Sequence, residues 1–362
     1  MSRGRVCMFV EYLYPVVSGG RVPFAGGIEV QLALLARGLA RRGFEVTVVT
    51  GDFGQPDGLV VDGVRLTTCY PPAAGVPVLR FFHPRLTGAV RALWRADADV
   101  YVFRGVAMWA GVVADVAHLR GRAYVQLVGH DHDVRADLPD VHGPRDRWWA
   151  RRALLGADAV VTQTEGQRRT LAAAFGRDAT VIMNAVELPP VAADAGAGAA
   201  IAWLSTYKPG KRPEWFTRFA ERHPDVRCRM AGVIPLPPLT DAAYRAAREV
   251  AARCPNLEVA GTIPHERIGD FLRGAGVLAH SSPAEGFPNV FLEAWALGLP
   301  CVTAFDPDGI LARERLGECH ATYEAWEAAL ERYARDPALR RDAGGRARAY
   351  AAAHHGSGAV VD

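Results

Sequence analysis

Short apolar runs alternate with segments of helical periodicity along nearly the whole chain, and this alternation limits the possible folds more than any other feature. Val6–Val10 is a continuous apolar run, and Val46–Thr50 is a second one. Between them, residues 28–39 carry apolar side chains at helical spacing, and Gly43 ends this helix. Continuous apolar runs are typical of strands buried on both faces. The pattern therefore predicts βαβ units and a mostly parallel sheet with helices on both faces.

The alternation occurs in two series. The first series extends to a short strand at residues 181–183, and the second begins with a strand at residue 201. Between them the composition changes to Pro, Ala and Gly without periodicity, as in an interdomain linker. We therefore predict an α/β protein with two Rossmann-like, doubly wound domains that face each other across a cleft. The predicted parts are an N-terminal domain at 1–187, a linker at 188–200, a C-terminal domain at 201–338, and a C-terminal helix at 339–362 that packs back toward the N-terminal domain.

Composition and charge exclude several classes of protein. The chain has 362 residues and a formal net charge of +3, with no long basic run, so we expect no nucleic-acid partner. No two of the six cysteines lie within four residues of each other, so no zinc or redox spacing is present. No apolar run approaches the roughly 18 residues of a membrane span, and the apolar stretch near the N-terminus is too short for a signal peptide. We expect a cytoplasmic protein.

One segment of the second series, residues 282–293, carries the strongest functional signal. It follows an apolar strand, and the carboxyl ends of such strands are where α/β sheets bind ligands. Gly286 permits a tight turn, and Pro288 suits the first position of a helix that runs to Leu297. The free N–H groups and positive dipole end of that helix favour a diphosphate. Glu285 and Glu293 could accept hydrogen bonds from sugar hydroxyls, although two glutamates at this spacing are also common on a solvated surface.

This segment resembles the corresponding motif of glycosyltransferase family four. The shared features are a Glu, the sequence Gly-Phe-Pro-Asn, and a second Glu eight residues after the first. The resemblance extends over nearly the whole chain. It includes Gly26–Glu29 before the first long helix, Ala159–Gln163, Asn184, and Lys211–Glu214. It implies the GT-B fold, a nucleoside-diphosphate sugar as donor, transfer with retention of anomeric configuration, and no metal.

The resemblance also implies roles for individual residues of this segment. Glu285 would contact hydroxyls of the donor sugar, and Glu293 would bind the ribose of the nucleotide. The turn and helix start would lie beside the diphosphate, with contributions from Gly286, Phe287, Pro288, Asn289 and Val290.

Gly26 and Gly27 lie before the first long helix and lack the G-x-G-x-x-G fingerprint of nicotinamide-binding proteins. A glycine pair at this place is also consistent with a simple tight turn. The resemblance implies instead that Gly26 and Gly27 let the backbone approach the donor phosphate.

A basic loop, residues 207–212, follows the first strand of the second series. Cations between a strand and a helix are well placed for phosphate oxygens, although a solvated charged turn has the same appearance. Lys211 matches the family lysine, but Ser205-Thr206 stands where the family has Gly-Arg. Lys208 is a candidate replacement for that arginine. We therefore expect Lys208 and Lys211 to bind the diphosphate.

A His-rich segment, residues 129–133, ends a strand of the first series. The family often places a histidine here, near the donor sugar and the acceptor, and we favour His130 over His132 as that residue. Such a cluster could also bind a metal. The D-x-D string, which holds a divalent metal in another glycosyltransferase class, occurs three times, at Asp97, Asp131 and Asp306, so it carries little weight. We predict no metal.

The sequence therefore predicts a retaining glycosyltransferase, with Glu285, His130 and Lys211 as its catalytic residues. The donor is a nucleoside-diphosphate sugar, and no separate cofactor is expected. The acceptor is a hydroxyl group of a polysaccharide, a glycolipid or a small-molecule glycoside. Trp148-Trp149, flanked by arginines, could contact a membrane surface or form an ordinary half-buried helix. Two alternatives are a sugar-nucleotide epimerase on the same fold and a catalytically weak sugar-nucleotide-binding protein.

Overall fold

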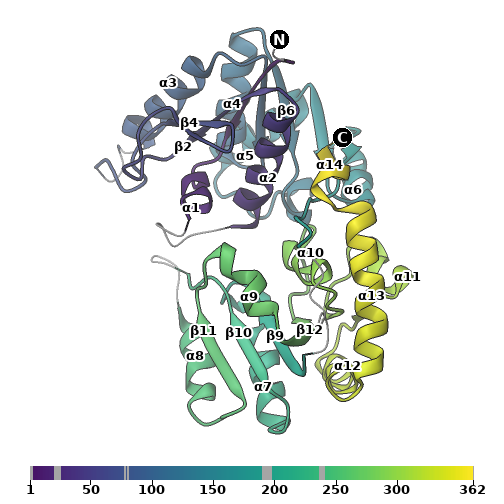
Figure 1. Cartoon of the computed structure of the whole chain (residues 1–362). Helices are drawn as coiled ribbons and strands as arrows, with labels where there is room; N and C mark the ends of the chain where they lie inside the picture. The colour runs from purple at the N-terminus through teal and green to yellow at the C-terminus, as the bar shows by residue number, and fades with distance from the viewer. Residues whose placement is uncertain are drawn as a thin grey trace. The chain divides into compact units, whose positions relative to one another are not determined.

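The computed structural model describes residues 3–19, 26–76, 79, 81–189, 198–235 and 241–361. The chain divides into two compact units, Met1–Asn184 with Val361–Asp362 and Ala185–Val360, and each contains one sheet of mostly parallel strands (Figure 1). Most of the predicted linker at 188–200 lies outside the described residues, as does part of the glycine-rich loop before Gly26. The predicted packing of the C-terminal segment against the N-terminal domain stays a prediction.

The first unit is built on an eight-stranded sheet with the order β3-β4-β2-β1-β5-β6-β7-β8. All neighbouring strands are parallel except the antiparallel pair β3–β4. The strands are β1 Arg5–Phe9, β2 Glu45–Thr50, β3 Leu59–Val61, β4 Val64–Thr68, β5 Val100–Arg104, β6 Ala123–Leu127, β7 Ala159–Thr162 and β8 Thr180–Val181. The helices are α1 Leu13–Val17, α2 Gly27–Arg41, α3 Thr87–Ala96, α4 Met108–Leu119, α5 Pro144–Gly156 and α6 Glu165–Phe175, with shorter turns η1 Phe81–Leu86 and η2 Asp131–Val134.

The second unit contains a six-stranded, fully parallel sheet with the order β11-β10-β9-β12-β13-β14. The strands are β9 Ala200–Leu204, β10 Cys228–Ala231, β11 Leu257–Gly261, β12 Ala275–His280, β13 Cys301–Thr303 and β14 Gly317–Cys319. The helices are α7 Pro213–Arg222, α8 Ala242–Ala251, α9 Ile268–Leu272, α10 Asn289–Ala296, α11 Ile310–Glu314, α12 Tyr323–Arg335, α13 Pro337–His354 and α14 Ser357–Val361, with turns η3 Pro209–Lys211, η4 His265–Arg267 and η5 Pro307–Gly309.

Both sheets reverse their strand order at one point. In the first sheet the chain moves outward from β1 in one direction and then returns to place β5 on the other side of β1. In the second sheet β9 and β12 have the same relation. Such a reversal sends the two following loops to opposite faces, and open α/β sheets bind their ligands in the space that this leaves. The predicted fold class, two doubly wound α/β domains, is confirmed.

Burial explains why the central strands form where they do. Every residue of β12 is buried, as is every residue of β9, which fits strands covered by helices on both faces. Helix α13 packs beside α10, α11 and α12 within the second unit (Figure 1). Gly344 of α13 makes this packing close, because a Cβ atom there would collide with the carbonyl oxygen of Gly298.

Candidate functional site

The loops after β9 and β12 meet where the strand order of the second sheet reverses. The first loop leads to Lys211 at the end of η3, and the second leads to Glu285. The Lys211 Nζ atom lies 2.5 Å from Oε1 of Glu285. The same carboxylate oxygen lies 3.2 Å from Nε2 of His280, the last residue of β12. Two of the residues predicted to act on the donor, Lys211 and Glu285, are therefore in direct contact.

Buried aromatic side chains hold both loops in place. The indole N–H of Trp203 in β9 donates to the hydroxyl of Ser281 over 3.0 Å, and that hydroxyl donates to the backbone carbonyl of Lys211 over 2.7 Å. On the other side, the indole N–H of Trp326 donates to the carbonyl of His280 over 3.3 Å. Both tryptophans are fully buried. The position of the Lys211–Glu285 pair is thus fixed by the core of the second unit.

The charges around Glu285 decide its protonation. Burial by itself would raise the pKa of this carboxyl, but the hydrogen bond and charge of His280, together with Lys211, lower the pKa to about 2. Glu285 is therefore ionised at neutral pH. An ionised, anchored carboxylate is an acceptor for hydroxyl groups, which is the chemistry that a sugar-binding residue needs.

Helix α10 begins directly after this loop. Pro288 is the N-cap and Asn289 is the first helical residue, so the predicted helix begins one residue later than expected. No side chain caps this helix end, and the positive end of a helix dipole favours an anionic ligand. Gly286 and Phe287 are buried beneath the turn, and Val290 is half-buried.

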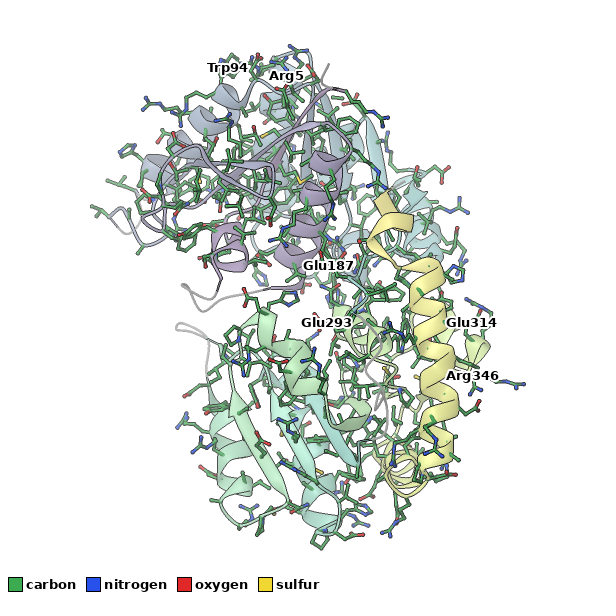
Figure 2. The ribbon with its side chains drawn as sticks, viewed as in Figure 1. Arg5, Trp94, Glu187, Glu293, Glu314 and Arg346 are labelled. Carbon is green, nitrogen blue, oxygen red and sulfur yellow. The ribbon has the colours of Figure 1, made fainter. Side chains whose placement is uncertain are left out.

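Glu293 lies on α10, one turn beyond its start, and is labelled in Figure 2. Its side chain is 18% exposed, and its Oε1 atom lies 3.6 Å from Nδ1 of His265 in η4. Burial raises the pKa of Glu293 to about 8. The pKa values of the two glutamates therefore shift in opposite directions, because His280 and Lys211 outweigh burial at Glu285, whereas burial dominates at Glu293.

Lys208 and Thr206 occupy the start of the loop between β9 and η3. The Lys208 side chain is exposed, and it makes no ion pair within the part of the chain that the structure describes. Thr206 is half-buried, and its carbonyl accepts a hydrogen bond from the Lys208 backbone N–H over 2.8 Å. The two candidate phosphate-binding lysines thus differ: Lys211 is engaged by Glu285, whereas Lys208 is available.

In the first unit, the glycine pair lies at the start of α2. Gly26 is the N-cap in an extended conformation, and Gly27 is the first helical residue and is exposed. The Glu29 carboxylate folds back to this helix end, where it accepts a hydrogen bond from its own backbone N–H. An anionic ligand at this end would therefore have to displace the Glu29 carboxylate or share the site with it.

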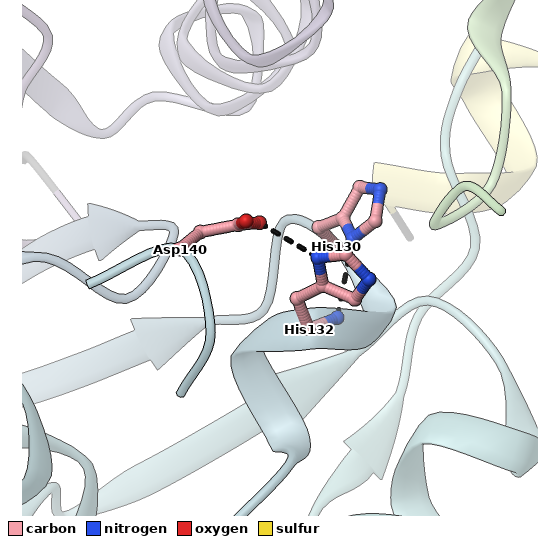
Figure 3. A group of neighbouring side chains, drawn as sticks. All are labelled: His130, His132 and Asp140. Carbon is pink, nitrogen blue, oxygen red and sulfur yellow. Dashed lines mark hydrogen bonds and ion pairs between the residues drawn. The ribbon is translucent and has the colours of Figure 1, made fainter. Parts of the chain in front are cut away.

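His130, His132 and Asp140 form a cluster at the carboxyl edge of the first sheet (Figure 3). Their potential ligand atoms lie within 4.8 Å of one another, so this set could hold a metal ion. Asp140 Oδ2 lies 2.9 Å from Nδ1 of His132. Nδ1 of His130 accepts the backbone N–H of His132 over 3.1 Å, so a metal ion on that nitrogen would break the cap of η2.

The three D-x-D strings bind protein groups. Asp97 and Asp99 form ion pairs with arginines of the first unit. Asp131 accepts the side-chain amide of Gln167, and Asp306 accepts backbone N–H groups at the start of α11. These aspartates therefore have structural roles in the fold. Their contacts with protein groups account for their positions without a metal ion.

Trp149 and Trp148 of helix α5 have different environments. Trp149 packs on Gly111 and donates its indole N–H to Asp115 over 3.0 Å, whereas Trp148 is 60% exposed beside the Arg152 guanidinium. Helix α5 therefore packs on the first unit through Trp149 and leaves Trp148 exposed. Among the described residues, no helix has both the length and the apolar composition to cross a bilayer.

The sequence did not predict three residues of the site: His280, Ser281 and His265. His280 and Ser281 end the strand that precedes the motif, and polar residues at the carboxyl end of a buried strand are themselves a signal of a binding site. No comparable signal marks His265, because its proximity to Glu293 depends on how α9 and α10 pack.

Two family models match the sequence. Residues 26–185 match a glycosyl transferase 4-like domain, and residues 201–335 match the glycosyl transferases group 1. Together these two models account for most of the chain, one for each unit. No curated protein matches the sequence.

Solved structures with the same fold cover most or nearly all of the chain. Sucrose-phosphate synthase from Thermosynechococcus elongatus has a TM-score of 0.77 at 20% identity, over 99% of this chain and 96% of that protein. Anabaena HepE in complex with UDP-glucose has a TM-score of 0.74 at 15% identity, over 99% and 97%. TarM from S. aureus, in a structure that holds UDP, has a TM-score of 0.63 at 13% identity, over 76% and 57%.

The two parallel-sheet units and the two matched domains define a glycosyltransferase of the GT-B class. The chain belongs to the glycosyltransferases that resemble family four, which confirms the resemblance seen in the sequence.

Proposed function

We propose that this glycosyltransferase transfers a hexosyl group from a UDP-sugar to an acceptor hydroxyl, with retention of anomeric configuration and without a metal ion. The observation that carries the proposal is the contact of Lys211 and His280 with the ionised Glu285 carboxylate at the strand reversal of the second sheet. Two similar structures support the choice of nucleotide, since HepE was solved with UDP-glucose and TarM with UDP.

The proposed donor site consists of groups from the second unit. Glu285 accepts hydrogen bonds from hydroxyls of the donor sugar, and Glu293 binds the ribose. The diphosphate lies at the uncapped start of α10, near the backbone of Gly286, Asn289 and Val290. These groups would fix the anomeric carbon and its leaving group relative to each other, and such positioning supplies a large part of catalysis.

Bond cleavage generates negative charge on the leaving UDP. The transition state is oxocarbenium-like, as in other glycosyl transfers, and interactions that strengthen as the charge develops lower the barrier. Lys208, Lys211 and the α10 dipole are the proposed sources of that stabilisation. The acceptor oxygen bonds to the anomeric carbon on the face from which UDP departs, and a phosphate oxygen of the donor takes the hydroxyl proton. Neither a protein nucleophile nor a protein base is then required.

The acceptor is proposed to bind to the first unit near His130. The His130 Nδ1 atom accepts a hydrogen bond and is therefore unprotonated, so a neutral ring carries its proton on Nε2. Such a ring can donate from Nε2 to a sugar oxygen. Gly26 and Gly27 are proposed to lie beside the donor phosphate. A peripheral contact with a membrane stays a prediction.

Incubation with UDP-glucose and a panel of sugar and glycoside acceptors tests the proposal. The expected result is UDP release that depends on the acceptor, persists in EDTA, and yields an α-linked product by ¹H NMR. Epimerised UDP-sugar in the absence of acceptor would indicate an epimerase instead. Tight binding of UDP-glucose without turnover of any acceptor would indicate a binding protein, and loss of activity in EDTA with rescue by manganese would contradict metal independence.

A further inference from the structure

Arg104 occupies the strand reversal of the first sheet. It is the last residue of β5, which lies beside β1 where the strand order changes direction. In the second sheet the equivalent strand is β12, whose last residue, His280, contacts Glu285. Arg104 therefore has the position in the first sheet that His280 has in the second. Open α/β sheets bind ligands at this position.

The Arg104 guanidinium is oriented by amide groups alone. Its Nη2 donates to Oδ1 of Asn184 over 2.6 Å, and the Asn184 side chain donates to Oε1 of Gln163 over 3.0 Å. Gln163 in turn donates to the carbonyls of Val128 and Gly129, both over 2.9 Å. This chain of hydrogen bonds fixes the guanidinium without neutralising its charge.

Arg104 has no carboxylate partner in the described part of the chain. No acidic oxygen lies within the 4.0 Å that defines an ion pair, and the buried Nε atom has no acceptor. Elsewhere in the first unit, Arg5 and Arg120 pair with Asp97. Arg85 and Arg177 donate to backbone carbonyls instead of carboxylates. The Nη1 atom of Arg104 has no protein partner either and is not enclosed.

The neighbouring acidic groups are engaged elsewhere. Burial lowers the pKa of Arg104 to about 10, while the more distant charges of Asp133 and Glu29 partly oppose this effect. Asp133 accepts the backbone N–H groups of Gly129 and His130 over 2.8 and 3.0 Å, and Glu29 is bonded at the start of α2. A partly buried guanidinium without a carboxylate is unfavourable, and an anionic ligand that supplies the missing partner would be bound strongly.

We propose that Arg104 is a binding residue for an anionic group of a substrate, a phosphate or a carboxylate, held at the carboxyl edge of the first sheet. The proposal rests on the proposed function, because that function requires a substrate at this edge. The anion could belong to the acceptor or be the diphosphate of the donor. Both sources share the chemistry that a guanidinium recognises, with paired N–H donors directed at two oxygens.

Titration of inorganic phosphate into the full-length protein, with and without saturating UDP, tests the proposal. Arg104→Gln removes the charge and keeps a donor for Asn184, whereas Arg104→Lys keeps the charge. Arg91→Gln, on the exposed face of α3, is the matched control for loss of one positive charge. We expect Arg104→Gln to weaken phosphate binding about tenfold or more, Arg104→Lys to retain most of it, and Arg91→Gln to match the wild type.

The two sources give different results. If the anion belongs to the acceptor, the difference between wild type and Arg104→Gln persists with UDP bound, and the affinity for UDP is unchanged. If it is the donor diphosphate, UDP abolishes the difference, and Arg104→Gln binds UDP about tenfold more weakly. Equal phosphate binding by wild type and Arg104→Gln, or no phosphate binding by the wild type, would overturn the proposal. Since phosphate binding needs no turnover, a failure of the transferase assay would remain a separate result.

Discussion

Two lysines on one loop differ in whether they form an ion pair, and this difference sets their expected roles. The Lys211 ammonium is already paired with Glu285, so it holds that carboxylate in place. Lys208 is exposed and unengaged among the described residues, and it lies two residues after Thr206, which replaces the family arginine. Lys208 is therefore the cation that can move to the leaving group without first giving up a protein partner.

Replacing Lys208 tests this role. Lys208→Ala should lower the single-turnover rate by about 10²–10³ and change donor affinity less, because the contact strengthens as charge develops. Thr206→Arg in the Lys208→Ala background should recover part of the rate by restoring the cation that the family places there. Lys208→Arg, which keeps the charge, is the control. A rate for Lys208→Ala equal to that of the wild type would make Lys208 a solvated turn residue.

The raised pKa of Glu293 predicts how stability depends on pH. The folded protein retains this proton up to about pH 8, whereas the unfolded chain loses it near 4.5, so the free energy of unfolding falls as pH rises between these values. Glu293→Gln removes the penalty, and the variant should gain up to about 1.4 kcal/mol over the wild type for each pH unit in this window.

Urea unfolding at pH 5 and pH 8 measures this effect. The advantage of Glu293→Gln should be small at pH 5 and should reach a few kcal/mol at most by pH 8. Glu324→Gln, at an exposed position of α12, is the control for loss of a carboxylate. A constant difference between Glu293→Gln and the wild type at both pH values would show that Glu293 is ionised normally.

At the scale of elements, the contact of α13 with the α10 region depends on one of two adjacent glycines. A Cβ on Gly344 would collide with the carbonyl oxygen of Gly298, whereas a Cβ on Gly345 would meet nothing within 4 Å. Gly344→Ala should therefore destabilise the protein by about 1–3 kcal/mol, since α13 must shift. Gly345→Ala should stabilise it by about 0.5–1 kcal/mol through helix propensity alone. Thermal unfolding of the two variants checks this, and equal effects would contradict the close packing.

The elements also show what the sequence could and could not predict. The sequence also predicts helices over residues 108–119 and 323–335, and these are the bounds of α4 and α12. The short strands β3 and β4 were missed, because three to five residues at a sheet edge carry little apolar signal. The strand orders of the two sheets are tertiary properties that no local pattern encodes.

The candidate site shows the same limit. The motif identified Glu285 and Glu293, but it could not reveal that Glu285 pairs with Lys211, 74 residues earlier in the chain. Nor could it reveal that the two glutamates titrate in opposite directions, because that difference arises from His280 and Lys211 on one side and from burial on the other. Sequence spacing predicts which residue types are present, and packing determines their charge state.

At the scale of the whole molecule, each of the two units contains its own parallel sheet and its own strand reversal. The reversal of the second sheet holds the Glu285 carboxylate with Lys211 and His280, and that of the first sheet holds Arg104. This division of chemistry fits an enzyme that binds two different substrates.

A ligand that binds the folded chain, at a concentration a hundredfold above its Kd, should raise the free energy of unfolding by about 2.7 kcal/mol.

Calorimetric titration of UDP into the wild type and Glu293→Ala tests the central claim most directly. The wild type should bind UDP, and Glu293→Ala should bind it about 1–3 kcal/mol more weakly, because hydrogen bonds to the ribose hydroxyls are lost. Glu324→Ala, at an exposed position of α12, should bind UDP like the wild type. Equal affinity of the wild type and a folded Glu293→Ala variant would contradict the assignment of the nucleotide site to α10, and no binding of UDP by the wild type would contradict the proposed donor.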